Sequence, residues 1–157
     1  MLSEAEYTRY AESYLDMVFR VAFGYVKNSA DADDITQAVF LRLWKRRPVF
    51  QDEAHAKYWL LRVTVNESKR CLCSPWRRSE SLETCEVPAL PSHAHREMLD
   101  IIERMKPKYR TALYLYYYEG LSTEEIAGVL KIPRSTVLTH LRRAREQFKQ
   151  EWTEAEQ

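Results

Sequence analysis

Apolar side chains recur every three or four residues through the first part of the chain, which is the spacing of one face of a helix. The first such stretch follows Ser3 and Glu6, whose three-residue spacing forms a capping-box pattern. It ends at Asn28, where polar residues interrupt the pattern. The pattern therefore predicts a long first helix whose apolar stripe consists of Tyr7, Tyr10, Tyr14, Met17, Val18, Val21 and Tyr25.

Two further helices are expected in the same half of the chain. Asp31 is predicted to cap the second, which continues to about Lys45 and has one apolar side formed by Ile35, Val39, Phe40 and Leu43. Pro48 breaks the helical pattern, so a loop is expected over about Arg47–Asp52. The third helix is predicted from about Glu53 to Leu72.

Residues 74–95 lose this periodicity and contain three prolines, several serines and acidic residues, which is typical of a linker. A second helical module is expected from near Arg96. Pro107 suits the first turn of one helix, and Gly120 is placed to end it. The prediction is an all-α chain with a three-helix module at 1–78, a flexible acidic linker at 79–95 and a four-helix module at 96–157.

The second module contains a predicted helix-turn-helix. Ser122 and Glu125 form another capping box and open a short helix over Thr123–Leu130. A tight turn at residues 131–133 leads into a last helix from about Arg134 to Trp152. This helix has an apolar stripe of Val137, Leu141, Ala144 and Phe148. Two helices joined in this way place the second in the major groove of DNA.

The face opposite that stripe carries the residue types that read DNA. Ser135, Leu138, Thr139, Arg142 and Arg143 can contact base edges or a thymine methyl group, while Arg134 and Arg145 lie at the flanks and suit phosphates. His140 lies beside the apolar stripe, so packing is at least as good an interpretation as a base contact. The motif indicates DNA binding but is shared by many regulators.

The formal net charge of +1 conceals two basic stretches. Residues 57–78 carry six basic side chains and one acid, and residues 131–149 carry the same balance, so each stretch has a net charge of +5. Residues 79–97 between them carry four Glu and one Arg, a net charge of −3. Two basic patches with an acidic connector suggest two contacts with a polyanion, although charge alone is equally consistent with two solvated helix faces.

The outer face of the second helix is unusual because it mixes polar groups with Leu41 and Trp44. Such a face suits protein binding. The alternative, equally supported by the residues, is that these two side chains pack against the first helix or the loop.

Three segments carry a family resemblance. DADDITQAVFLRLW (31–44) resembles conserved region 2 of the extracytoplasmic-function sigma factors of bacterial RNA polymerase, KYWLLRVTVNESKR (57–70) resembles the helix that follows it, and LSTEEIAGVLKIPRSTVLTHLRRAR (121–145) resembles region 4. The resemblance covers about residues 5–78 and 97–150. Ala38 departs from the acidic residue usual at its position, and Leu138 and His140 stand where the family is often basic.

This resemblance implies an alternative sigma factor that binds the β′ clamp and β flap of core RNA polymerase and directs it to promoter DNA. Polymerase binding is expected at Asp34, Gln37, Leu41 and Trp44. Binding and melting of the downstream (minus-ten) element is expected at Tyr58, Trp59, Arg62, Asn66, Lys69 and Arg70, with a flipped base held by the preceding loop. The last helix is expected on the upstream (minus-thirty-five) element. Family members are commonly restrained by an anti-sigma factor, which is therefore an implied partner.

Other functions are less well supported by the residues. The sequence has no catalytic constellation or phosphate loop, so we predict neither an enzyme nor a cofactor, and no apolar stretch suits membrane insertion or secretion, so a cytoplasmic protein is expected. Cys71, Cys73, Cys85, His93 and His95 do not have a recognised zinc spacing. The main alternative is an autonomous helix-turn-helix repressor or activator with a sensing or dimerising N-terminal module, and a metal- or thiol-based sensor is a third hypothesis.

Overall fold

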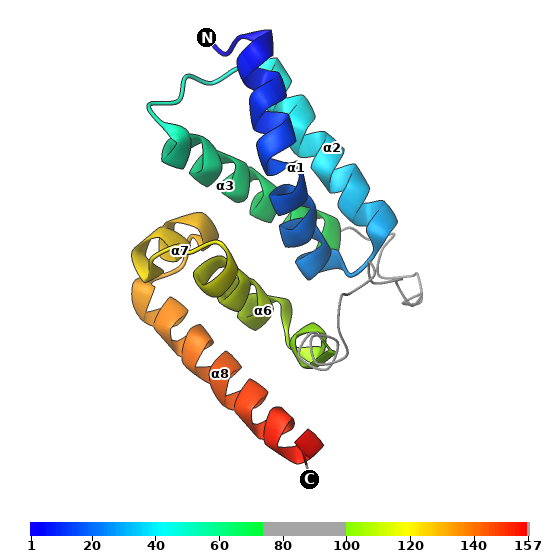
Figure 1. Ribbon diagram of the computed structural model, residues 1–157, viewed down its shortest axis with the longest axis vertical. Coiled ribbons are helices and arrows are strands. Elements are labelled where there is room, and N and C mark those ends of the chain that lie inside the picture. Colours follow the sequence, from blue (N-terminus) through cyan, green and yellow to red (C-terminus); the bar gives the residue numbers. More distant parts are fainter. Residues whose placement is uncertain (74–99, 157) are drawn as a thin grey trace. The chain divides into compact units, whose positions relative to one another are not determined.

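The computed structural model describes residues 1–73 and 100–156, which divide between two compact units, Met1–Cys85 and Glu86–Gln157. Within the described ranges all regular structure is helical (Figure 1). No helix among these residues is long and apolar enough to cross a membrane. The predicted linker at 79–95 lies outside the described residues.

The first unit consists of α1 (Glu4–Val26), α2 (Ser29–Arg46) and α3 (Glu53–Leu72), each of which packs against the other two. Fully buried aliphatic side chains from all three helices form its core, among them Val18, Val39, Leu43, Leu60 and Leu61. Removal of this apolar surface from water is the main force that holds the three helices together.

Local signals set the helix ends in this unit. Ser3 and Glu6 form the predicted capping box of α1. The predicted cap of α2 was wrong: Asn28 caps the helix, and its side chain accepts a hydrogen bond from the backbone N–H of Asp31. Lys27 adopts a left-handed conformation, so the chain reverses in a single residue and the cap comes earlier than Asp31.

Contacts between residues distant in sequence fix α3 against α1. The Glu53 carboxylate at the start of α3 pairs with Arg9 and accepts a hydrogen bond of 2.7 Å from the Tyr14 hydroxyl. In the preceding loop, Phe50 packs edge-on against the rings of Tyr10 and Trp59, at centroid distances of 5.5 and 5.9 Å. The loop is therefore attached to both helices.

The second unit contains a helical segment at 100–104, then α6 (Pro107–Leu113), η1 (Tyr114–Tyr118), α7 (Thr123–Leu130) and α8 (Arg134–Glu156). α8 packs against α6 and α7. The core consists of residues such as Met105, Leu115, Ile126, Leu141 and Ala144. Phe148 and Trp152 stack on each other and extend the core along α8.

Two backbone features precede the helix-turn-helix: the π-helical turn η1 and a left-handed glycine. The predicted single helix from Pro107 widens into a π-helical turn at η1, in which the backbone N–H of Glu119 donates to the Tyr114 carbonyl. Gly120 follows with a φ of +71°, the left-handed conformation for which glycine is suited. The Ser122–Glu125 capping box then starts α7 as predicted.

Candidate functional site

The structure presents three candidate surfaces, two on the first unit and one on the second. The first is the outer side of α2, where Asp34, Gln37 and Leu41 are exposed. Leu41 exposes 52% of its surface, so a large part of this apolar side chain meets solvent.

Trp44, the fourth residue predicted on this face, is half-buried. Its ring meets the edge of the Tyr7 ring at 5.0 Å, and the Arg47 guanidinium lies 4.0 Å above it. Of the two interpretations left open by the sequence, packing therefore applies in part to Trp44, while Leu41 projects into solvent.

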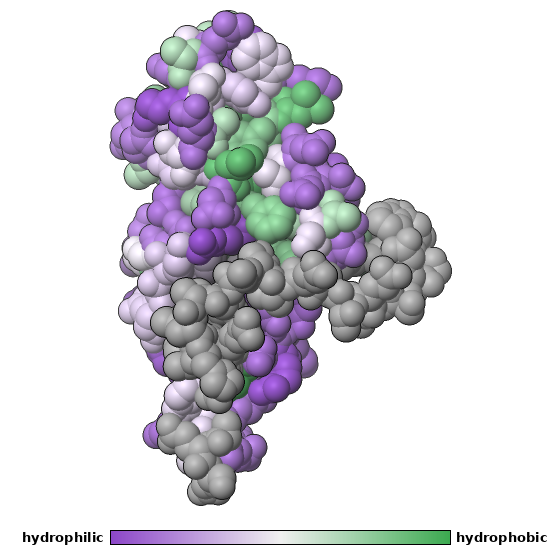
Figure 2. Space-filling model, turned by 45° about the vertical axis from the view of Figure 1, so that its right-hand side comes forward, coloured by the Kyte–Doolittle hydropathy of each residue, from purple (hydrophilic) through white to green (hydrophobic). Residues whose placement is uncertain are grey.

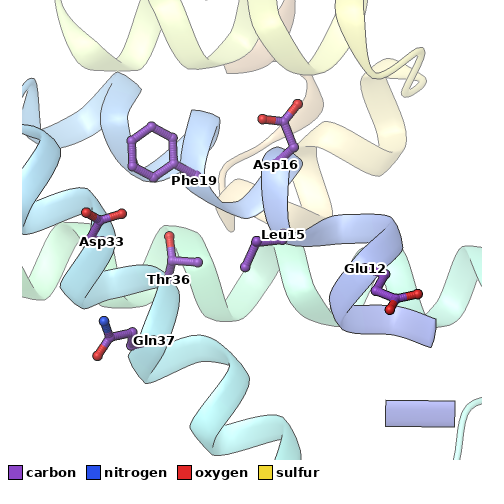
Figure 3. Close-up of a pocket in the computed structure, with 7 residues that line it drawn as sticks. All are labelled: Glu12, Leu15, Asp16, Phe19, Asp33, Thr36 and Gln37. Carbon is purple, nitrogen blue, oxygen red and sulfur yellow. The ribbon is translucent and has the colours of Figure 1, made fainter. Parts of the chain in front are cut away.

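An open groove with a volume of about 440 Å³ lies between α1 and α2 beside this face (Figure 3). α1 contributes Glu12, Leu15, Asp16 and Phe19, and α2 contributes Asp33, Thr36 and Gln37. Three carboxylates surround apolar groups, so the groove combines negative charge with hydrophobic surface. Figure 2 shows hydrophobic side chains gathered in a band across one face of the first unit, bordered by hydrophilic ones.

Of the residues that line this groove, sequence reasoning named only Gln37 as a site residue. Leu15 and Phe19 were missed because they lie off the main apolar stripe of α1. Their i, i+4 spacing outside that stripe was the available signal, since two apolar residues at this spacing share a helix face.

The second surface is the side of α3 opposite its buried stripe. By helical geometry the six residues predicted to bind the downstream element share this side. Asn66, Lys69 and Arg70 are exposed, whereas Tyr58, Trp59 and Arg62 are half-buried.

Two of those residues, Trp59 and Arg70, contact neighbouring side chains. The edge contact with Phe50 leaves the Trp59 ring only partly accessible. Glu67 lies 2.7 Å from Arg42 of α2 and 3.6 Å from Arg70, so one carboxylate joins α2 to the basic side of α3.

In the preceding loop, the backbone N–H of Gln51 donates to Nδ1 of His55, and Asp52 caps α3 by accepting from the backbone N–H of His55. The loop before the basic surface is therefore held by hydrogen bonds as well as by Phe50.

The third surface is the outer side of α8. Val137, Leu141 and Ala144 are buried as predicted, and Leu138 is exposed on the other side. Ser135, Arg142, Arg143 and Arg145 are also exposed, while Thr139 is half-buried and donates to the Ser135 carbonyl.

The two predicted flanking arginines make side-chain contacts. Nε of Arg134 donates to the Thr123 hydroxyl at 3.0 Å, which joins the start of α8 to the start of α7. Nε of Arg145 donates to the Tyr117 hydroxyl at 2.6 Å.

His140 packs inside the second unit, which is one of the two interpretations that its position beside the apolar stripe left open. Its ring meets the Tyr109 ring edge-on at 5.4 Å, and Nδ1 is buried without a hydrogen-bond partner among the described residues. Burial, with smaller contributions from the positive charges of Lys108 and Arg143, lowers the pKa of His140.

The described residues do not assemble a metal site. Cys71 is half-buried and Cys73 is exposed at the end of α3, whereas Cys85, His93 and His95 lie outside the described ranges. No group of three or more His, Cys, Asp or Glu side chains within residues 1–73 and 100–156 could hold a metal ion.

Comparison with known proteins identifies both units. Residues 10–78 match the family model "Sigma-70 region 2", and residues 95–148 match "Sigma-70, region 4". The chain is 30% identical to the RNA polymerase sigma-E factor of Streptomyces coelicolor, over 93% of this chain and 85% of that one. It is 28% identical to the ECF RNA polymerase sigma-E factor of Haemophilus influenzae, over 85% and 80% of the two chains.

The fold is also that of a solved member. The sigma factor RpoE from Bartonella quintana, crystallised with the anti-sigma factor NepR, superposes with a TM-score of 0.78 at 17% identity, covering 94% of this chain and 97% of that one. With both family models in order and a relative of nearly equal extent, the chain belongs to the extracytoplasmic-function sigma factors, the alternative sigma factors that bind RNA polymerase and direct promoter-specific initiation.

Proposed function

We propose that the three surfaces divide the work of a sigma factor: the outer side of α2 binds core polymerase, the basic side of α3 holds the melted downstream element, and the outer side of α8 reads the upstream element. The observation that carries the proposal is that each unit presents a basic helix face opposite its buried stripe. We extend these roles to the predicted regions 1–78 and 96–157, with the linker at 79–95 between them.

The polymerase-binding surface is proposed to include the groove between α1 and α2. Gln37 lines the groove and also belongs to the α2 face with Asp34 and Leu41. Carboxylates around Leu15 and Phe19 suit a basic, amphipathic partner helix, because such a helix supplies both opposite charge and apolar side chains.

The downstream element is proposed to bind as separated single strands. Asn66 offers an amide that can hydrogen-bond to the edge of an extruded base, and Lys69 and Arg70 offer positive charge to the backbone. Tyr58 and the accessible part of Trp59 offer aromatic surface for stacking. The loop at 47–52, held by Phe50 and His55, would contribute to the pocket for that base.

The upstream element is proposed to lie along α8. Arg142 and Ser135 project from the face opposite the buried stripe, where a helix in the major groove meets base edges. Leu138 offers an apolar contact of the kind that a thymine methyl group accepts.

An anti-sigma factor is proposed as a further partner, since the Bartonella sigma factor of the same fold was crystallised with one. We further propose that the chain acts in the cytoplasm, where polymerase and promoter meet, and that it contributes binding surfaces and no catalysis of its own.

Transcription by core polymerase on fragments of the source genome, with and without this protein, tests the proposal. We expect new, discrete start sites that Asn66→Ala or Arg143→Ala weakens strongly. Arg104→Ala is the matched control, because this exposed arginine pairs with Glu151 away from the proposed DNA faces. Starts insensitive to Asn66→Ala and Arg143→Ala would refute the assigned surfaces. Folded protein that binds duplex DNA but gives no new starts would favour an autonomous regulator.

A further inference from the structure

The guanidinium of Arg145 on α8 is held by two tyrosines of η1. Its carbon atom lies 5.6 Å from the ring centroid of Tyr116 and 5.4 Å from that of Tyr117. The two rings meet edge-on at 4.9 Å, and the hydroxyl that accepts the Nε–H bond is that of Tyr117. The arginine is therefore fixed by one hydrogen bond and two cation–π contacts.

This arrangement leaves the terminal amino groups of Arg145 able to bind a phosphate. An arginine side chain has one N–H on Nε and four on its terminal nitrogens, and phosphate is bound mainly through such paired donors. Because Tyr117 engages Nε, the terminal amino groups keep their capacity to donate. Tyr117 itself is 61% exposed, so the pair lies at the surface, where such contacts add little to stability.

We propose that Tyr117 is a positioning residue that orients Arg145 toward the phosphates bordering the upstream element. The inference rests on the proposed role of α8 in DNA binding. Its physical basis is preorganisation: an arginine already held near its bound geometry loses less side-chain freedom when it meets a phosphate. The Tyr117 ring lies against the guanidinium, and its hydroxyl fixes the direction of the Nε–H group.

The test uses the full-length protein in complex with core polymerase and a promoter fragment located by the transcription experiment. Tyr117→Phe removes only the hydroxyl and keeps the ring. We expect its affinity for duplex promoter to fall roughly three- to tenfold, the scale of one hydrogen bond. We also expect the slope of log affinity against log salt to become shallower by up to about 0.9, the value of one phosphate contact. The melting temperature of the free protein should be unchanged.

Tyr116→Phe is the matched control, since it removes the hydroxyl from the neighbouring ring beneath the same guanidinium. It should leave affinity and salt slope at the wild-type values. An equal effect of both substitutions would overturn the proposal, because the bond from Arg145 would then not be the cause.

A double-mutant cycle separates positioning from direct contact. If Tyr117 acts through Arg145, Tyr117→Phe has no further effect once Arg145→Ala is present. Additive losses would show that Tyr117 meets DNA itself and would overturn the positioning role. If Arg145→Ala weakens binding while Tyr117→Phe does not, only this inference fails. If Arg142→Ala, Arg143→Ala and Arg145→Ala all leave binding intact, the proposed role of α8 fails with it.

Discussion

Leu41 and Leu43 stand two residues apart on α2 and offer a matched pair for testing its role in polymerase binding. Leu43 is fully buried in the core of the first unit, whereas Leu41 exposes 52% of its surface. Leu41→Ala should leave the free energy of unfolding within about 1 kcal/mol of wild type, because little packing is lost. Leu43→Ala should lower it by about 2–5 kcal/mol, since it leaves a cavity.

The loss expected in polymerase binding follows from the same exposure. Complete burial of a leucine side chain is worth about 1.5–3 kcal/mol, and about half of the Leu41 surface remains to be covered by a partner. Leu41→Ala should therefore weaken binding to core polymerase by about 0.8–1.5 kcal/mol, or roughly four- to twelvefold.

Competition between labelled wild-type protein and each variant for core polymerase measures the affinity, and thermal unfolding of the free variants measures stability. Two results would refute the reasoning. Unchanged polymerase binding by Leu41→Ala would remove Leu41 from the interface. A loss of more than about 2 kcal/mol in folding stability would show that its main role is packing.

Two further predictions concern charged groups in the two units. Glu67→Gln removes the carboxylate that joins Arg42 to α3, and because the Glu67 side chain is only 14% exposed, we expect the melting temperature to fall by the equivalent of about 1 kcal/mol of stability. The control is Asp16→Asn, which breaks an exposed pair with Arg20 and should cost less than about 0.5 kcal/mol. Equal losses from the two substitutions would contradict the prediction. The lowered pKa of His140 means that the unfolded chain binds this proton first, so the second unit should lose stability as the pH falls below about 6.5 and down to the lowered folded-state pKa. His140→Phe should reduce that loss in melting curves between about pH 7.5 and 5.5, and an unchanged pH dependence would argue against a buried neutral imidazole.

The sequence determined the helices well, because their ends depend on residues three or four positions apart. The predicted bounds Glu53–Leu72 and Thr123–Leu130 agree with α3 and α7, and both capping boxes are present. The apolar period likewise identified the buried stripe of α8. The error at Asp31 arose where two suitable caps were close together, and the left-handed Lys27 selected Asn28.

Family membership was also available from the sequence, because the motifs of regions 2 and 4 occur in order and with the family's spacing. The faces of the candidate surfaces followed from the helical period alone. The helical period did not show which of these residues are accessible, because it places a side chain on one side of a helix but does not identify the side chains that cover it. Trp44 and Trp59 are both half-buried for this reason, through Tyr7 and Phe50.

Only the tertiary structure decided the contacts between distant parts of the chain. The bond from Arg145 to Tyr117 spans 28 residues, and the pair of Arg9 with Glu53 spans 44. Such contacts depend on how α8 packs on α6 and how α3 packs on α1. The burial of apolar surface selects both arrangements through many weak interactions at once. Local patterns therefore specified the elements of this protein, and packing specified which of its charged groups are held in place.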